Sequence, residues 1–299
     1  MKNKGVLCAL LGGAIWGFSG TCGQYIFSFT NMNALTLTWF RLLVAGIVLT
    51  ILSLIKYPEQ VKKILCNKKD CLHCVLFATV GLLICQWSYL EAIQYSNSAT
   101  ATVFQYSGIL FIMILTCLIK KRLPLIKEVV ALGLVLLGVF FVATHGQTDG
   151  LVISDMALFW GFVTCLAMCS YSMLPGHLLS TYGASNVLGW SMLIDGILTT
   201  FMVKPWTLSL SIDFKLVVLV GFIVIFGTMI AFTLYMLGIS YIGAMRASMI
   251  ACVEPVVATI TSFFWLHTSF TGLDLFGFIC IVLGVLMINY QKEPTLQNE

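Results

Sequence analysis

Long, uninterrupted runs of apolar residues constrain this chain more than any other feature. Hydrophobic residues make up 60% of its 299 positions and charged residues only 9%, a composition typical of membrane proteins rather than of soluble domains. A helix that crosses a bilayer needs about 20 mostly apolar residues. Polar breaks divide the sequence into ten runs of about that length, near residues 5–27, 34–55, 73–94, 98–119, 125–144, 154–174, 184–203, 215–238, 241–266 and 270–290.

All ten runs are predicted to be helical. A transmembrane β-barrel would show short segments of alternating polarity, and irregular backbone cannot leave its polar groups unpaired in lipid. The sequence therefore predicts an all-α integral membrane protein with ten transmembrane helices and no large soluble domain. The first run follows Lys2 and Lys4 but lacks a signal-peptide cleavage site, so we expect it to be retained as a span.

The placement of basic residues predicts the orientation, because cytoplasmic loops hold an excess of Lys and Arg. With the N-terminus inside, Lys204 and Lys215 fall outside, Arg41 and Arg246 fall within spans, and every other Lys and Arg falls on the cytoplasmic side. This pattern predicts a multi-pass protein of the cytoplasmic (inner) membrane. Both termini, including the tail 291–299, are expected in the cytoplasm, and nucleic acid is not expected as a partner.

The chain also carries an internal repeat. Residues 89–142 align without a gap with residues 235–288, and five identities follow between residues 34–50 and 184–200. The chain therefore divides into a first half, 1–150, and a second half, 151–290, each with five spans. Because five is odd, the second half enters the membrane from the opposite side. Such inverted repeats place a substrate site near the midplane, where the halves meet.

Several short motifs recur in a characteristic order along the two halves. They are Ala14-Ile15-Trp16-Gly17, Arg41-Leu42-Leu43, the segment Tyr89 to Ala101, Val253-Glu254-Pro255-Val256 and Gly284-Val285. Together they resemble the EamA type of the drug/metabolite transporter superfamily across nearly the whole chain. The resemblance implies a secondary transporter that moves a small organic solute, such as an amino acid or related metabolite, by alternating access, with export as the expected direction.

This chain departs from the family pattern at two places. The Glu usually found at the end of the fourth span of each half is replaced by Lys121 and His267, and Ser107-Gly108-Ile109 replaces a Pro-containing triplet.

Polar side chains on the spans indicate where a solute would bind, because such groups are costly in hydrocarbon unless they face a cavity or a partner. Spans three and four carry most of them, and aromatic residues on spans one and eight could stack on a substrate. The substrate-binding candidates are Trp16, Gln86, Tyr89, Thr102, Gln105, Tyr106 and Tyr235. The alternative is that each polar group only bonds a neighbouring helix, worth about 1 kcal/mol.

Ionisable residues within the spans are candidates for coupling or gating: Arg41, Glu91, Asp195, Arg246 and Glu254. Arg41 and Glu91 both fall near the outer ends of their spans and could form a gate pair. A helix-pairing role is equally open for Arg41 and Asp195.

Glu254 is the best candidate for a buried carboxyl group. Pro255 follows it and has no backbone N–H, so the carbonyl of Ala251 loses its helical partner and the helix is expected to kink there. Broken helices of this sort mark transporter binding sites. Because a carboxyl group can gain and lose a proton, a buried Glu254 is a candidate proton carrier. The alternative is a permanent pair with a buried base or hydroxyl that holds span nine in place.

Glycines 12, 13, 17, 20 and 23 line much of the first span. Small residues allow transmembrane helices to approach closely. This glycine stripe fits either a helix that moves during transport or one that is statically packed.

Other classes of function remain as alternatives. Efflux of lipophilic cations would require an unpaired carboxylate in an aromatic cavity. An intramembrane enzyme would require a catalytic set at helical depth, yet all four His residues lie near span ends and no H-E-x-x-H or Walker A pattern occurs; we therefore expect neither catalysis nor a cofactor. A scaffold without transport would have no polar cavity. The expected partners are a small-molecule substrate and the lipid bilayer, and a homodimer stays open.

Most of the 11 cysteines fall within apolar runs, where Cys behaves as a small hydrophobic residue. The cluster Cys66, Cys71, His73 and Cys74 has metal-ligand residue types, but the intervening basic residues disfavour a cation. No metal site is therefore predicted.

Overall fold

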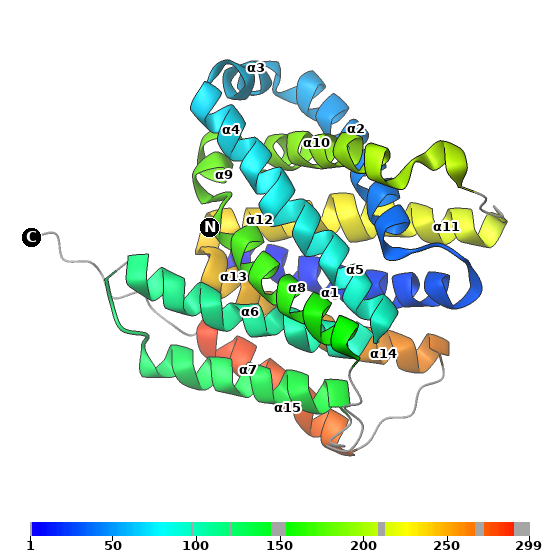
Figure 1. Ribbon diagram of the computed structural model, residues 1–299. Helices are drawn as coiled ribbons and strands as arrows, with labels where there is room; N and C mark the ends of the chain where they lie inside the picture. The colour runs from blue at the N-terminus through cyan, green and yellow to red at the C-terminus, as the bar shows by residue number, and fades with distance from the viewer. Residues whose placement is uncertain are drawn as a thin grey trace, which may run out of the picture.

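The computed structural model describes residues 2–96, 98–119, 121–144, 154–208, 213–266 and 272–289, and every regular element in these ranges is helical (Figure 1). The helices are α1 (Lys2–Phe29), α2 (Ala34–Lys56), α3 (Pro58–Cys66), α4 (Lys68–Leu76), η1 (Phe77–Leu83), α5 (Ile84–Tyr95), α6 (Ser98–Ile119), α7 (Ile126–Thr144), α8 (Asp155–Met173), α9 (Gly176–Tyr182), α10 (Ala184–Val203), η2 (Pro205–Thr207), α11 (Phe214–Phe222), η3 (Ile223–Ile230), α12 (Ala231–Ile242), α13 (Ala244–Ala251), α14 (Glu254–Leu266) and α15 (Gly272–Asn289).

The all-helical membrane fold is confirmed. Seven described segments are long and apolar enough to cross a bilayer: Asn3–Phe29, Ala34–Lys56, Lys68–Tyr95, Asp155–Tyr182, Ala184–Thr207, Phe214–Ile242 and Ala244–Trp265. The other three predicted runs coincide with α6, α7 and α15. The count of ten spans and the opposite orientation of the two halves stay predictions, and the tail 291–299 lies outside the described residues.

Two of the long helices change their winding partway along. A π-helical stretch, η1, continues α4 into α5, and η3 likewise continues α11 into α12. The two stretches occupy equivalent positions in the predicted halves. Residue 77, where η1 begins, precedes the aligned segment 89–142 by as many residues as residue 223, where η3 begins, precedes the segment 235–288. π-Helical turns are uncommon and occur often at functional sites. Ile223 of η3 lines the cavity described below, and η1 ends two residues before Cys85, which also lines it.

Glycine governs how closely the helices approach. A Cβ added at Gly46 would lie 2.4 Å from the backbone N of Leu193 on α10, and one at Gly138 would lie 2.5 Å from the carbonyl O of Gly277 on α15. Both distances are shorter than real Cβ contacts, so only glycine fits at these crossings. The α2–α10 and α7–α15 pairs each join a helix of the first half to one of the second (Figure 1).

The glycine stripe of α1 packs in the same way against the second half. A Cβ at Gly13 would meet the carbonyl O of Ala251 at 2.6 Å, and one at Gly17 would meet the carbonyl O of Glu254 at 2.4 Å. The predicted close approach is confirmed for these two glycines, and it seats α1 against both sides of the break between α13 and α14.

Local sequence explains several helix starts. The side chain of Asn33 accepts a hydrogen bond from the backbone N of Thr36, and that of Asp213 accepts one from Leu216. Such N-caps satisfy backbone donors that a helix start leaves free. Gly183 and Gly243 precede α10 and α13 with φ of 81° and 83°, a left-handed conformation that glycine adopts without strain.

Candidate functional site

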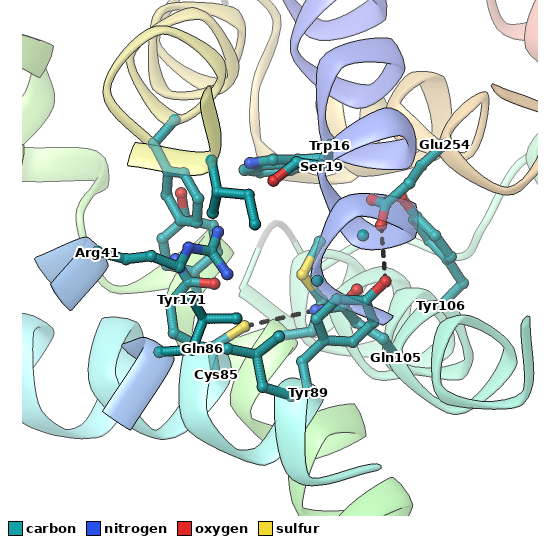
Figure 2. A pocket seen from close by; sticks show the side chains of 17 residues that line it. Trp16, Ser19, Arg41, Cys85, Gln86, Tyr89, Gln105, Tyr106, Tyr171 and Glu254 are labelled. Carbon is teal, nitrogen blue, oxygen red and sulfur yellow. Dashed lines mark hydrogen bonds between the residues drawn. The ribbon is translucent and has the colours of Figure 1, made fainter. Parts of the chain in front are cut away.

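A cavity lies between helices of both halves (Figure 2). Its free volume is about 40 Å³, far below the roughly 300–1,000 Å³ of pockets that hold drug-sized ligands. The described conformation is therefore a contracted one that must widen for any larger solute. The lining residues are Trp16, Ser19, Gly20, Gly23, Leu37, Arg41, Cys85, Gln86, Tyr89, Leu90, Gln105, Tyr106, Met168, Tyr171, Ile223, Phe232 and Glu254.

Glu254 enters the cavity from a break in the helix that carries it. Helix α13 ends at Ala251 and α14 begins at Glu254, so the interruption predicted from Pro255 is confirmed. Glu254 is buried, and its two carboxyl oxygens each face a tyrosine hydroxyl. The hydroxyl oxygen of Tyr106 lies 2.6 Å from Oε2 of Glu254, and that of Tyr89 lies 3.2 Å from Oε1 (Figure 2). These bonds match the alternative in which Glu254 pairs with hydroxyls.

The Tyr106 hydroxyl also caps the helix break. It lies 2.9 Å from the carbonyl O of Ala251, the group that Pro255 was predicted to leave without a partner. A phenol has only one hydrogen to donate, yet two acceptors surround this one. If Glu254 is a neutral acid, it can donate to the Tyr106 oxygen while Tyr106 donates to Ala251. If Glu254 is ionised, one of the two acceptors loses its bond.

Arg41 lines the opposite side of the cavity in Figure 2. It is 5% exposed, and its Nε donates to Oγ1 of Thr228 at 2.9 Å. Thr228 in turn donates to the carbonyl O of Ile223, five residues earlier, as the π-helical winding of η3 allows. The cavity thus carries a cationic group from α2 and a carboxyl group from α14, and the carboxyl is bonded by tyrosines rather than by the arginine.

The predicted Arg41–Glu91 pair is not formed among the described residues. Glu91 accepts a hydrogen bond from Nε1 of Trp87 at 2.8 Å, on its own helix, while Arg41 bonds η3. Arg246, on α13, is half-buried and lies outside the cavity lining.

Asp195 lies on α10, also away from the cavity lining. It is 0% exposed, and neither carboxyl oxygen has a hydrogen-bond partner within the described residues. A helix-pairing bond from Asp195 is therefore not found in this part of the chain.

The remaining predicted substrate residues support the cavity to different degrees. Gln105 lines it and donates from Nε2 to the sulfur of Cys85 at 3.8 Å. Thr102 lies just behind the lining, with its hydroxyl 3.3 Å from that of Tyr89. Tyr235 is a further layer away. Its ring lies 4.9 Å from that of Trp16, and its hydroxyl bonds serines on α8 and α13.

Two aromatic residues of the cavity lining, Tyr171 and Phe232, were not selected from the sequence. The ring of Tyr171 stacks on Tyr235 at 5.8 Å and meets Phe232 edge-on at 5.7 Å. Tyr171 and Phe232 reach the cavity, and Tyr235 stands behind them. A weak signal exists in the sequence, since Met168 and Tyr171 are three residues apart and share a helical face.

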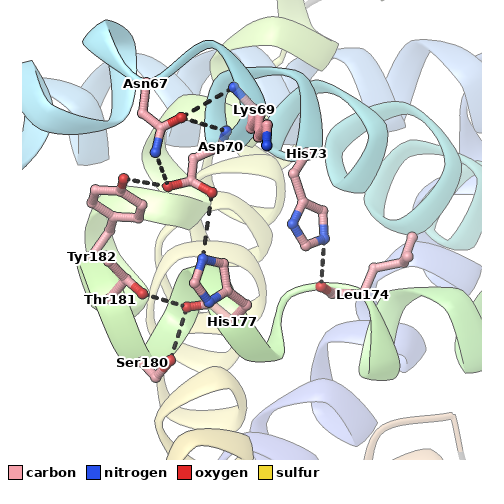
Figure 3. Close-up of polar contacts among 9 residues, drawn as sticks. All are labelled: Asn67, Lys69, Asp70, His73, Leu174, His177, Ser180, Thr181 and Tyr182. Carbon is pink, nitrogen blue, oxygen red and sulfur yellow. Dashed lines mark hydrogen bonds and ion pairs between the residues drawn. The ribbon is translucent and has the colours of Figure 1, made fainter.

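A polar cluster at one end of the molecule joins α4 to the second half (Figure 3). Asp70 accepts from the hydroxyl of Tyr182 at 2.6 Å and lies 3.4 Å from Nε2 of His177. His73 bonds the carbonyl O of Leu174 at 2.9 Å. Nothing among the described residues gathers three metal-ligating side chains. The Cys- and His-containing segment thus serves here as a junction between α4 and the α8–α9 turn.

An apolar, all-helical chain that encloses a polar cavity defines a multi-pass membrane protein of the transporter kind. The chain belongs to the EamA-like transporter family, whose model matches residues 3–144 and again residues 155–290. The resemblance found in the motifs is thereby confirmed.

Relatives agree with this assignment. The chain is 36% identical to the "Uncharacterized inner membrane transporter YicL" of Salmonella typhimurium, covering 97% of both chains. It is 26% identical to the "Uncharacterized transporter YyaM" of Bacillus subtilis, covering 96% of this chain and 94% of that one. These names state transport and indicate no catalytic activity.

The fold also occurs among solved structures. One, described only as the crystal structure of a protein, superposes with a TM-score of 0.74 at 15% identity, covering 94% of this chain and 95% of the other. At that identity the similarity concerns the fold alone.

Proposed function

We propose that this protein is a secondary transporter that moves a small organic solute, an amino acid or related metabolite, across the cytoplasmic membrane by alternating access. Export is the proposed direction. Ten helices in two inverted five-helix halves, 1–150 and 151–290, would rock around the cavity, with both termini in the cytoplasm. The contracted cavity fits an occluded stage of such a cycle.

The observation that carries this proposal is the make-up of the cavity. Its walls come from both halves, with Arg41 and Tyr106 from the first and Tyr171 and Glu254 from the second. A guanidinium and a carboxyl group face one space without forming a direct bond. A solute with both an acidic and a basic group could engage each of them. A scaffold protein needs no polar cavity between its helices, and ionisable groups in hydrocarbon are costly.

Glu254 is the proposed coupling residue. In the neutral form it completes a chain of hydrogen bonds from its own O–H through Tyr106 to the carbonyl of Ala251. Loss of the proton leaves either the carboxylate or that carbonyl short of a donor. A buried acceptor without a donor costs about 1–3 kcal/mol, which is enough to shift an equilibrium between two arrangements of the α13–α14 break. Proton release at Glu254 would thus favour a change in helix geometry.

Flux measurements in proteoliposomes test the function. Uptake and efflux of labelled amino acids would be followed with and without an imposed pH gradient, for the wild type, Glu254→Gln and Gln105→Ala. Glu59→Gln is the matched control, because Glu59 is exposed on α3 and lies outside the cavity. We expect saturable flux that the gradient accelerates, with the acceleration lost only in Glu254→Gln and the apparent affinity reduced in Gln105→Ala.

Two results would contradict parts of this proposal. Flux that ignores both the gradient and Glu254→Gln would assign Glu254 a structural role. Transport of lipophilic cations without transport of any amino acid would favour the alternative efflux function. The presence of Arg41 in the same cavity disfavours that alternative, because a cationic solute would meet a like charge.

A further inference from the structure

We infer that the side of the cavity around Arg41 is a carboxylate-binding subsite, so that the transported solute carries a carboxylate group there. This inference rests on the proposed function, since it requires that a solute enters the cavity. It goes beyond that function by naming the chemical group that the solute must have and the residues that recognise it.

Three buried polar atoms in the cavity wall have no hydrogen-bond partner among the described residues. They are Nε1 of Trp16, Nε2 of Gln86 and the hydroxyl of Tyr171, and all three residues line the same cavity. An indole N–H and an amide NH₂ can only donate, and a phenol can donate as well. Leaving a buried donor unsatisfied costs about 1–3 kcal/mol. Three such donors around one space therefore indicate a ligand rich in acceptors.

Arg41 adds positive charge to the same cavity, which it lines together with Trp16, Gln86 and Tyr171. In Figure 2 its side chain lies across the cavity from Glu254. The bond to Thr228 uses Nε alone, and a guanidinium has five N–H donors in a planar fork. That fork matches the two oxygens of a carboxylate. Charge and donor chemistry thus agree on an anionic group with two acceptor oxygens.

The opposite side of the cavity has different chemistry. Glu254 and its two tyrosines offer oxygen lone pairs, which suit an ammonium or a neutral polar group. A lipophilic cation without a carboxylate would leave the donors of Trp16 and Tyr171 unsatisfied. The carboxylate is therefore assigned to the Arg41 side alone.

Matched probes separate this subsite from general binding. The thermal unfolding midpoint of the purified full-length chain would be measured at increasing concentrations of each standard amino acid. A ligand that binds the folded state raises this midpoint, so the titration yields an apparent affinity. Each amino acid that binds would then be compared with its carboxamide and with its decarboxylated amine. Both analogues keep the amine and the side chain but lack the carboxylate. We expect both to bind at least about tenfold more weakly than the acid.

Conservative variants test the named donors. Trp16→Phe and Tyr171→Phe remove one N–H or O–H and keep an aromatic ring, and Arg41→Gln removes the charge. Each should weaken the binding of the acids about tenfold or more and change the binding of the amides little. Trp39→Phe is the matched control, since its Nε1 donates to Thr200 at 2.8 Å, away from the cavity; it should leave the affinity unchanged.

The outcomes distinguish this inference from the proposed function. Equal binding of acids and amides, no binding of any acid, or unchanged binding of the acids in all three variants would overturn the carboxylate subsite. Saturable flux of solutes without a carboxylate, measured in proteoliposomes, would also overturn it while transport stands. Acid-selective binding that the variants abolish, in a protein that transports none of these acids, would uphold the subsite and contradict the transport function.

Discussion

Gly17→Ala tests how tightly the position of Glu254 depends on the packing of α1. The added Cβ would lie 2.4 Å from the carbonyl O of Glu254, where ordinary contact begins at 3.4 Å. Helices α1 and α14 must therefore separate by about 1 Å locally, and overpacking of this kind costs about 1–3 kcal/mol. A shift of that size along the 2.6 Å bond from Tyr106 to Glu254 would lengthen it to about 3.6 Å, which is no longer a hydrogen bond.

Stability and flux together measure this effect. Unfolding by SDS titration in mixed micelles should show a loss of about 1–3 kcal/mol for Gly17→Ala, and flux in proteoliposomes should lose its response to the pH gradient. Gly138→Ala is the control for destabilisation alone, because its Cβ would meet Gly277 at 2.5 Å on helices that do not line the cavity. Gly133→Ala, with nothing within 4 Å, controls for the substitution itself. A Gly17→Ala protein as stable and as gradient-responsive as the wild type would refute the reasoning.

Three further substitutions probe other polar groups. Tyr106→Phe should destabilise by about 1–3 kcal/mol in the same titration, and more than Tyr89→Phe, because it removes a donor shared by Glu254 and Ala251; equal losses would contradict this. Asp195→Asn should keep or raise the stability, since neither carboxyl oxygen has a donor in the described part of the chain, and a loss above about 1 kcal/mol would reveal a partner. Arg122→Gln should lower the free energy of unfolding by about 1–3 kcal/mol, because two N–H donors, each 2.8 Å from a carboxyl oxygen of Glu128, are lost. The hydrogen bond to Glu128 raises the pKa of Arg122, so Arg122 stays charged at mildly alkaline pH. The stability difference between wild type and variant should therefore not shrink as the pH rises into that range.

The sequence was most informative where a single residue has an unavoidable backbone consequence. Pro255 lacks an N–H, so an interruption near Ala251 follows from covalent chemistry alone, and the structure has it at residues 252–253. Long apolar runs likewise leave a membrane-embedded chain little choice but helix. Gly13 and Gly17 could be recognised as sites of close approach, although their partner helix could not be named from spacing.

The sequence alone did not predict which side chains contact one another between helices. Arg41 and Glu91 look like a gate pair by depth, but depth along a helix says nothing about which way a side chain faces around the axis. Arg41 turns towards Thr228, and Glu91 is held by Trp87 within its own helix. Tyr235 and Tyr171 pose the same problem, since both are aromatic residues inside spans and only the packing of α8 against α12 decides which of them reaches the cavity.

The π-helical stretches explain part of this difficulty. Helical periodicity assigns residues to faces on the assumption of 3.6 residues per turn, and a π-helical turn inserts extra rotation that reorients every residue beyond it. Span three carries such a stretch at residues 77–83 and span eight carries one at residues 223–230, just before the segments that supply Gln86 and Phe232 to the cavity. Which residues of these two spans face the cavity therefore depends on irregular winding, which composition and spacing do not reveal. Restoring regular α-helix in η3 should therefore rotate Phe232 relative to the cavity and displace Thr228, which accepts the hydrogen bond from Nε of Arg41.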